Sequence, residues 1–141
     1  MRPRERRQPI KAEPMVEGPV DDIAPGRSQT RALALEIADI LTDTPASDTR
    51  VLDIAMLTPI ADFFVLCSGE NERQLRAISR EVTDTLASRQ RRPQRTEGSA
   101  ASGWILIDYG DVVVHVFATD QRSFYRLDEL WSEAPTLLAI Q

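Results

Sequence analysis

Two side chains could in principle form a nucleophile–base pair: Cys67, the only cysteine, and His115, the only histidine. A Cys–His nucleophile needs hydrogen-bond contact and a third group that orients the base. Both residues instead lie in apolar runs typical of strands, where a free cysteine usually behaves as a small hydrophobic residue. A zinc site would need two further ligands from carboxylates. We therefore expect no catalytic residue and no metal site here.

Three aspartates are the next candidates, because carboxylates hold Mg²⁺ on phosphates in nucleotidyltransferase-like enzymes. Asp108 and Asp111 flank a predicted turn, and Asp62 precedes a predicted strand. The usual pattern places two acids one residue apart on a strand, whereas Asp108 and Asp111 are three apart. Asp also stabilises turns through local hydrogen bonds. The sequence has no Gly-rich phosphate motif. Turn stabilisation is the simpler interpretation, and a phosphoryl-transfer enzyme remains the rival.

Two aromatic residues point to binding instead of catalysis. Trp104 begins a predicted strand after a Gly-rich loop, and Tyr109 lies at a predicted hairpin tip, where a side chain is hard to bury. Trp and Tyr often anchor protein interfaces. From the pattern alone, a core position for Trp104 is an equally good interpretation. We assign Phe63, Phe64 and Phe117 to the core.

The elements predicted to position these residues follow the order helix, strand, strand, helix, strand, strand, helix. The helices are recognised by apolar residues at a spacing of three and four, and the strands by apolar or β-branched runs. The predicted ranges are a helix from Ser28 to about Leu41, strands at 50–56 and 63–67, a helix at 70–88, a hairpin of 104–108 and 112–117, and a helix at 123–131. Residues 89–103 are expected to be a polar, flexible connection. This order predicts an α/β fold with a mixed β-sheet flanked by helices.

The length of 141 residues indicates one domain. Residues 1–27 hold five of the nine prolines and few large apolar residues. Such a segment buries too little surface to offset its ordering entropy. We therefore predict a disordered N-terminal extension at 1–27, a folded domain at 28–134 and a C-terminal tail at 135–141.

Charge restricts the class of partner. The chain has a net charge of −5. An acidic body suits a basic protein better than the phosphates of a nucleic acid, so no direct nucleic-acid contact is expected. No apolar run approaches the roughly 20 residues that span a bilayer, so no membrane partner is expected. A start without an apolar stretch and a single cysteine favour the cytoplasm.

Five sequence blocks, in their order and spacing, resemble the signature of the RsfS/Iojap family of ribosomal silencing factors. The blocks are Asp62–Gly69, Arg73–Ile78, Glu97-Gly98, Trp104–Phe117 and Arg122–Trp131. The resemblance covers about residues 30–134. It implies a fold similar to that of nucleotidyltransferases, without their catalytic acids, activity or a cofactor.

The resemblance also implies a partner and a role. Family members bind the large-subunit ribosomal protein L-fourteen, block joining of the small subunit and repress translation during starvation. The residues that we expect to bind the partner are Trp104, Asp108, Tyr109, Gly110, Asp111 and Arg73. A large-subunit assembly factor that uses the same docking face is the alternative. A homodimer of the free chain also stays open.

Overall fold

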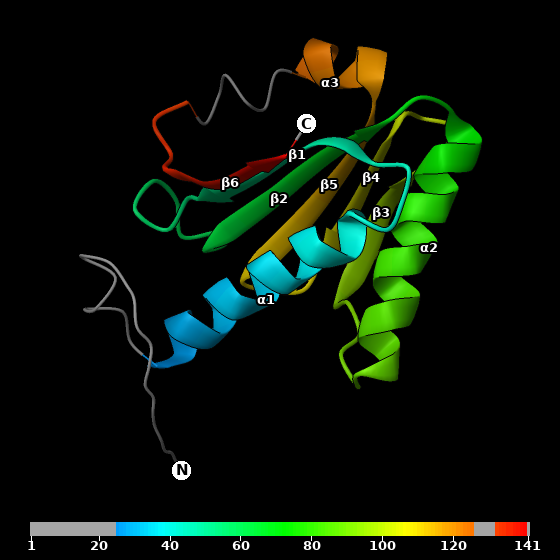
Figure 1. Cartoon of the computed structure of the whole chain (residues 1–141). Coiled ribbons are helices and arrows are strands. Elements are labelled where there is room, and N and C mark those ends of the chain that lie inside the picture. The colour runs from blue at the N-terminus through cyan, green and yellow to red at the C-terminus, as the bar shows by residue number, and fades with distance from the viewer. Residues whose placement is uncertain (1–24, 126–131, 141) are drawn as a thin grey trace.

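A six-stranded mixed sheet carries two long helices on one face (Figure 1). The computed structural model describes residues 25–125 and 132–140. The elements are α1 (Pro25–Leu41), β1 (Ser47–Asp53), β2 (Phe63–Gly69), α2 (Glu72–Ser88), β3 (Arg95–Ser99), β4 (Trp104–Asp108), β5 (Val112–Ala118), α3 (Thr119–Tyr125) and β6 (Thr136–Ile140). The strand order is β3-β4-β5-β2-β1-β6, with β2 and β5 parallel and every other pair antiparallel. The predicted mixed sheet with flanking helices is confirmed.

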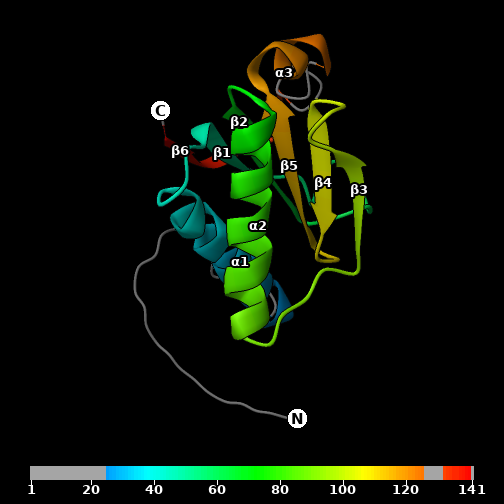
Figure 2. The same ribbon diagram turned by 90° about the vertical axis from the view of Figure 1, so that its right-hand side faces the viewer.

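The two long helices form where their apolar residues can meet the sheet. In α2 the buried residues are Leu75, Ile78, Val82 and Leu86, which form a single apolar stripe. Asn71 caps this helix, because its side-chain oxygen accepts a hydrogen bond from the Gln74 N–H at 2.8 Å. Figure 2 shows α1 and α2 on the same side of the sheet. None of the described helices could cross a membrane.

The sheet has a hydrophobic core on each face. The larger core lies between the sheet and the helices α1 and α2. A smaller core lies on the opposite face, which we call the second face; it includes Leu52, Ile54, Phe64, Leu66, Val113 and Phe117. Every residue of β2 is buried, as expected for a continuous apolar run covered on both faces. The core positions predicted for Phe63, Phe64 and Phe117 are confirmed.

Two predicted irregular segments are strands. Residues 95–99, expected to belong to a flexible connection, form the edge strand β3 beside β4. Residues 136–140, expected to lie in a tail, form β6 and pair with β1 at the other edge. Both predictions were wrong because edge strands are held by main-chain hydrogen bonds to one neighbour. They need no continuous apolar face of their own.

The two helical ends also differ from prediction. Helix α1 begins at Pro25, within the predicted extension, and Ser28 lies inside the helix instead of capping it. Proline is well suited to the first turn of a helix because its missing N–H would have no partner there. The closing helix is α3, which starts at Thr119 and is described as far as Tyr125. The remainder of the predicted helix at 126–131 lies outside the described residues, as do residues 1–24.

Candidate functional site

Strand β4 divides its side chains between the two faces of the sheet. Ile105 and Ile107 are buried toward the helices, whereas Trp104, Leu106 and Asp108 point to the second face and remain half-buried. The alternation follows from the pleat of a strand, which turns successive side chains to opposite faces. The second face of β4 is therefore the part of this strand that a partner can reach.

Trp104 is held in place by its neighbours on β5. Its ring stacks on Phe117, with ring centroids 5.3 Å apart, and on His115 at 5.9 Å. The indole Nε1–H donates a hydrogen bond to His115 Nδ1 at 3.2 Å. Trp104 packs against the second core yet stays half-buried. It is therefore partly a core residue and partly a surface residue, the two positions that the sequence left open. Such an aromatic side chain can contact a partner with little loss of side-chain entropy.

A shallow hollow lies beside Trp104 on the second face. It is lined by Glu97, Gly98, Ser102, Trp104 and Leu106. Glu97 pairs with Leu106 across the β3–β4 ladder, so the two side chains share a face. Arg95 on β3 forms ion pairs with Glu97 and with Asp108, the latter at 3.1 Å. We call the surface formed by Arg95, Glu97, Trp104, Leu106 and Asp108 the docking face.

Asp108 also holds the β4–β5 turn. Its Oδ1 accepts a hydrogen bond from the Gly110 N–H at 2.7 Å, and the Tyr109 N–H donates to the Val112 carbonyl at 2.9 Å. Gly110 has a φ of +94°, and a Cβ added there would meet Gln94 Nε2 at 2.8 Å. The turn therefore requires glycine at this position. The turn-stabilising interpretation of Asp108 is confirmed.

Tyr109 does not form an exposed tip. Its side chain is buried among the residues of the larger core, on the opposite face from Trp104. Its hydroxyl has no hydrogen-bond partner among the described residues, and burial raises the pKa of Tyr109 to about 12. The expectation of an exposed tip was wrong because the alternation of β4 continues into the turn and directs residue 109 toward the helices.

Asp62 and Asp111 lie together at the end of the sheet. The Asp111 carbonyl accepts hydrogen bonds from the N–H groups of Asp62 and Phe63, at 2.8 and 3.0 Å. Desolvation raises the pKa of Asp62, and the negative charge of Asp111 raises it further. Asp108 is instead engaged by Arg95 and Gly110. Within the described residues, no three acidic, histidine or cysteine side chains are placed to share a metal ion.

Cys67 and His115 are not brought together. Cys67 belongs to the larger core, whereas His115 pairs with Leu66 and points to the second face beside Trp104. Burial raises the pKa of Cys67 to about 12 and lowers that of His115 to about 4. Near neutral pH the thiol and the imidazole are therefore both uncharged. An activated cysteine would instead be a thiolate stabilised by a nearby positive charge.

Arg73 lies apart from the other predicted partner-binding residues. It is exposed in the first turn of α2, which covers the helical side of the sheet. Arg95, Glu97 and Leu106 were not among the residues predicted from the sequence, yet they lie beside Trp104 and Asp108 on the docking face. The alternation of β4 could have identified Leu106. The place of β3 could not be found in this way, because its five residues carry no apolar pattern.

Comparisons of sequence relate the chain to ribosomal silencing factors. The sequence model of the family described as "Ribosomal silencing factor during starvation" matches residues 27–140. The chain is 41% identical over 93 residues to the ribosomal silencing factor RsfS of Bacillus subtilis, covering 66% of this chain and 79% of that protein. It is 32% identical over 121 residues to the chloroplastic protein Iojap of Arabidopsis thaliana, covering 82% of this chain and 46% of that protein.

Comparisons of structure agree with this similarity. A crystal structure of a protein from Bacillus halodurans matches with a TM-score of 0.67 at 34% identity, covering 77% of this chain and 98% of that one. A second, of a protein from Chromobacterium violaceum, matches with a TM-score of 0.66 at 30% identity, covering 74% of this chain and 85% of that one. The fold described above is therefore shared with solved structures of related sequence.

Proposed function

Because the chain belongs to the RsfS family of ribosomal silencing factors, we propose that it represses translation by binding the large ribosomal subunit in the cytoplasm. The finer proposal is that it binds ribosomal protein L-fourteen and sterically blocks joining of the small subunit. Blocking requires only that the protein occupies surface, so no reaction, cofactor or metal is needed.

The observation that carries this proposal is the fixed, half-buried Trp104 on the docking face. Its ring is stacked on Phe117 and its N–H is bonded to His115, so the side chain is oriented before binding. Well-packed tryptophan residues are among the strongest anchors of protein interfaces. A standard interface covers about 800 Å² per partner, which a domain of this size can supply.

The predicted partner-binding residues take different parts in this proposal. Trp104 and Asp108 lie on the docking face, and Gly110 and Asp111 lie in the adjoining turn, where Asp111 also borders α1. Tyr109 supports the turn from inside the larger core. Arg73 lies on the helical side of the sheet and is outside the proposed contact. The acidic groups at the docking face and turn suit a basic protein.

The test uses purified ribosomal subunits. We expect saturating protein to cosediment with large subunits and to lower the fraction of joined ribosomes. Trp104→Ala should weaken binding to large subunits by about 2 kcal/mol or more, a hot-spot magnitude. Circular dichroism and thermal unfolding must show that this variant folds, because Trp104 also packs on Phe117.

Two results would overturn the proposal: subunits that join equally well with and without saturating protein, or a protein that never cosediments with large subunits. Precursor large subunits accumulating in cells that lack the protein, with no change in subunit joining, would favour the assembly role instead.

A further inference from the structure

Large apolar side chains are exposed at one place in particular. Among the described residues, four large hydrophobic side chains are exposed: Met56 (93%), Ile60 (72%), Leu57 (42%) and Ile140 (38%). Three of them lie in the segment Met56–Ile60 between β1 and β2, which we call the apolar loop. Single exposed apolar residues are ordinary, but a cluster on one loop indicates an interaction site.

The apolar loop is held by a defined set of hydrogen bonds. The N–H groups of Leu57 and Thr58 both donate to the Ile54 carbonyl, at 2.9 and 3.2 Å. The Ile60 N–H donates to Thr58 Oγ1 at 3.2 Å, and the Ile54 N–H donates to the Asp62 carbonyl at 2.9 Å, which closes the base of the loop. The exposed side chains are therefore displayed by an organised turn, which lowers the entropy lost on binding.

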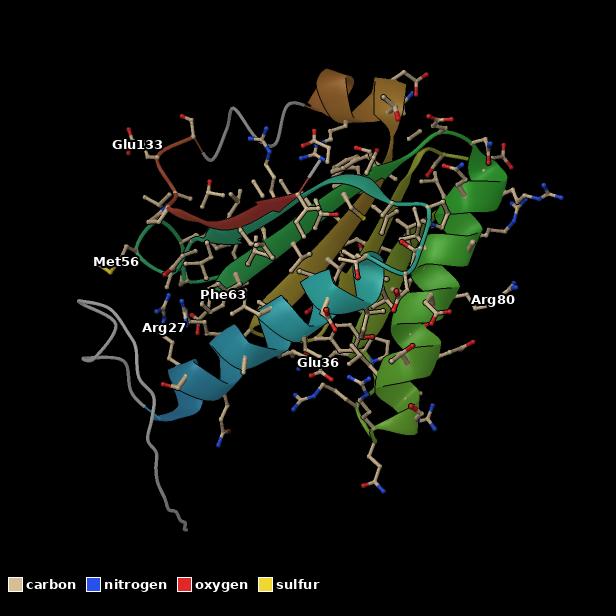
Figure 3. All side chains as sticks on the ribbon, viewed as in Figure 1. Arg27, Glu36, Met56, Phe63, Arg80 and Glu133 are labelled. Carbon is tan, nitrogen blue, oxygen red and sulfur yellow. The ribbon has the colours of Figure 1, made fainter. Side chains whose placement is uncertain are left out.

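The flanks of the loop place it on the same side of the molecule as the docking face. Ile54 and Ala61, on either side of the loop, are both buried in the second core. The loop also adjoins the β4–β5 turn, because Asp62 and Phe63 donate to the Asp111 carbonyl. Figure 3 shows Met56 at the tip of this loop, pointing away from the ribbon.

Strand geometry sets the separation of the loop from Trp104. Four residue steps along β4 span about 14 Å, and three strand spacings from β4 to β1 span about 14 Å, so the diagonal from Trp104 to Leu52, just before the loop, is about 20 Å. The loop continues outward from this point. A standard interface of about 800 Å² per partner is about 30 Å across. One partner can therefore contact Trp104 and the apolar loop together.

The charges around the loop indicate the chemistry of the partner. Asp62 and Asp111 lie at its border, and neither forms a salt bridge with another described residue. The charge of Arg27 lowers the pKa of Asp62, but desolvation and the charge of Asp111 outweigh it and raise that pKa overall. Acidic groups repel nucleic-acid phosphates. Met56, Leu57 and Ile60 also lack the aromatic rings that stack on bases. The surface fits a basic protein with an apolar depression.

We propose that the apolar loop is a second anchor, which inserts Met56 and Ile60 into an apolar depression on the same basic large-subunit protein that the docking face binds. This inference rests on the proposed function. The docking face supplies Trp104 at one end of the contact, and the loop supplies aliphatic side chains at the other.

The test compares the loop with exposed apolar surface elsewhere. The double variant Met56→Ala/Ile60→Ala should bind isolated large subunits at least tenfold more weakly, and the isolated protein L-fourteen by a similar factor. Its thermal unfolding should be unchanged, because both side chains are exposed. The matched control Ile140→Ala removes exposed apolar surface from β6 and should bind like the unaltered protein.

A second pair of variants tests the loop by charge. Met56→Asp should weaken binding at least as strongly as the double variant, because it would bury a charge at the contact. Ala77→Asp adds the same charge on the exposed side of α2 and should leave binding unchanged.

The outcomes separate this inference from the proposed function. If the unaltered protein binds, Trp104→Ala weakens binding and the loop variants bind normally, the second anchor is wrong and the proposed function stands. If the unaltered protein does not bind large subunits, both are wrong. If the loop variants abolish a dimer of the free chain in sedimentation equilibrium but bind subunits normally, the loop contacts a second copy and the inference is overturned. A loss seen with subunits but not with isolated L-fourteen would assign the loop to a different component and would also overturn it.

Discussion

At the scale of single residues, the informative group is the aromatic cluster around His115. Nδ1 of this histidine accepts a hydrogen bond from the indole N–H of Trp104. The imidazole ring packs edge-on against Phe64 and lies parallel to the ring of Phe117. Its Nε2 is buried and has no hydrogen-bond partner in the described ranges 25–125 and 132–140. Accepting at Nδ1 requires the neutral ring to carry its proton on Nε2. The only histidine therefore orients Trp104 instead of transferring protons.

This arrangement predicts a pH dependence of stability. Burial lowers the pKa of His115 in the folded state from 6.5 to about 4. Between these values the unfolded chain binds a proton that the folded chain excludes, so the free energy of unfolding falls as the pH falls. The contribution of His115 is fully present above pH 6.5 and is lost as the pH approaches 4. Its size is on the order of 3 kcal/mol.

The measurement is chemical denaturation across this pH range for the unaltered protein and for His115→Gln. Glutamine can still accept the indole hydrogen bond but does not titrate. We expect the variant to lose stability less steeply on acidification, whatever its stability at neutral pH. Equal slopes for the two proteins would show that His115 is not kept neutral by the fold.

At the scale of elements, the β3–β4 edge decides whether the docking face exists. Strand β3 is exposed along its whole length and is held by its ladder to β4. Gly98 makes this pairing possible, because it has a φ of +78° and a Cβ there would lie 2.0 Å from the Trp104 carbonyl oxygen. No side chain fits at this distance, so another residue would force the two strands apart.

We therefore predict that Gly98→Ala destabilises the protein by on the order of 2 kcal/mol and weakens binding to large subunits. Binding should weaken because Gly98 lines the hollow beside Trp104. Hydrogen exchange should show faster opening of β3 and β4 than of β2. The control is Gly26→Ala, where a Cβ meets nothing within 4 Å and alanine favours the helix. Normal binding and stability of Gly98→Ala would contradict this role.

At the scale of the whole molecule, the two sides differ in charge. Residues 71–94 contain six arginines and three acidic residues, a net charge of +3, although the whole chain is −5. This segment includes α2, which lies on the helical side of the sheet; Figure 3 shows Arg80 pointing outward from it. The docking face carries Glu97 and Asp108 with one arginine, Arg95, and Asp62 and Asp111 lie at the border of the apolar loop. The proposed contact surface is therefore the side suited to a basic partner.

This polarity predicts a salt dependence of association. The rate of binding to large subunits should fall as ionic strength rises, while the dissociation rate changes little, because long-range attraction acts mainly on encounter. Asp111→Asn should lower the association rate at low salt and lose this difference at high salt. Stopped-flow fluorescence measures both rates. An association rate that is independent of salt would show that charge does not steer the encounter.

The sequence determined those parts of the fold that depend on local pattern. The continuous apolar run of β2, the helical stripe of α2, the β4–β5 hairpin and the buried Phe63, Phe64 and Phe117 follow from spacing and residue type alone. Each of these elements buries large apolar surface, and that burial imposes a period of two or 3.6 residues on the sequence. The order of the signature blocks likewise identified the family.

Only the tertiary structure decided how these elements present a surface. Strands β3 and β6 are held by main-chain hydrogen bonds to one neighbour, which leave little trace in residue type. The faces of Trp104 and Tyr109 depend on which side of β4 the helices cover, and the separation of Arg73 from Trp104 depends on the same packing. These relations join residues that are distant along the chain, so no local period encodes them.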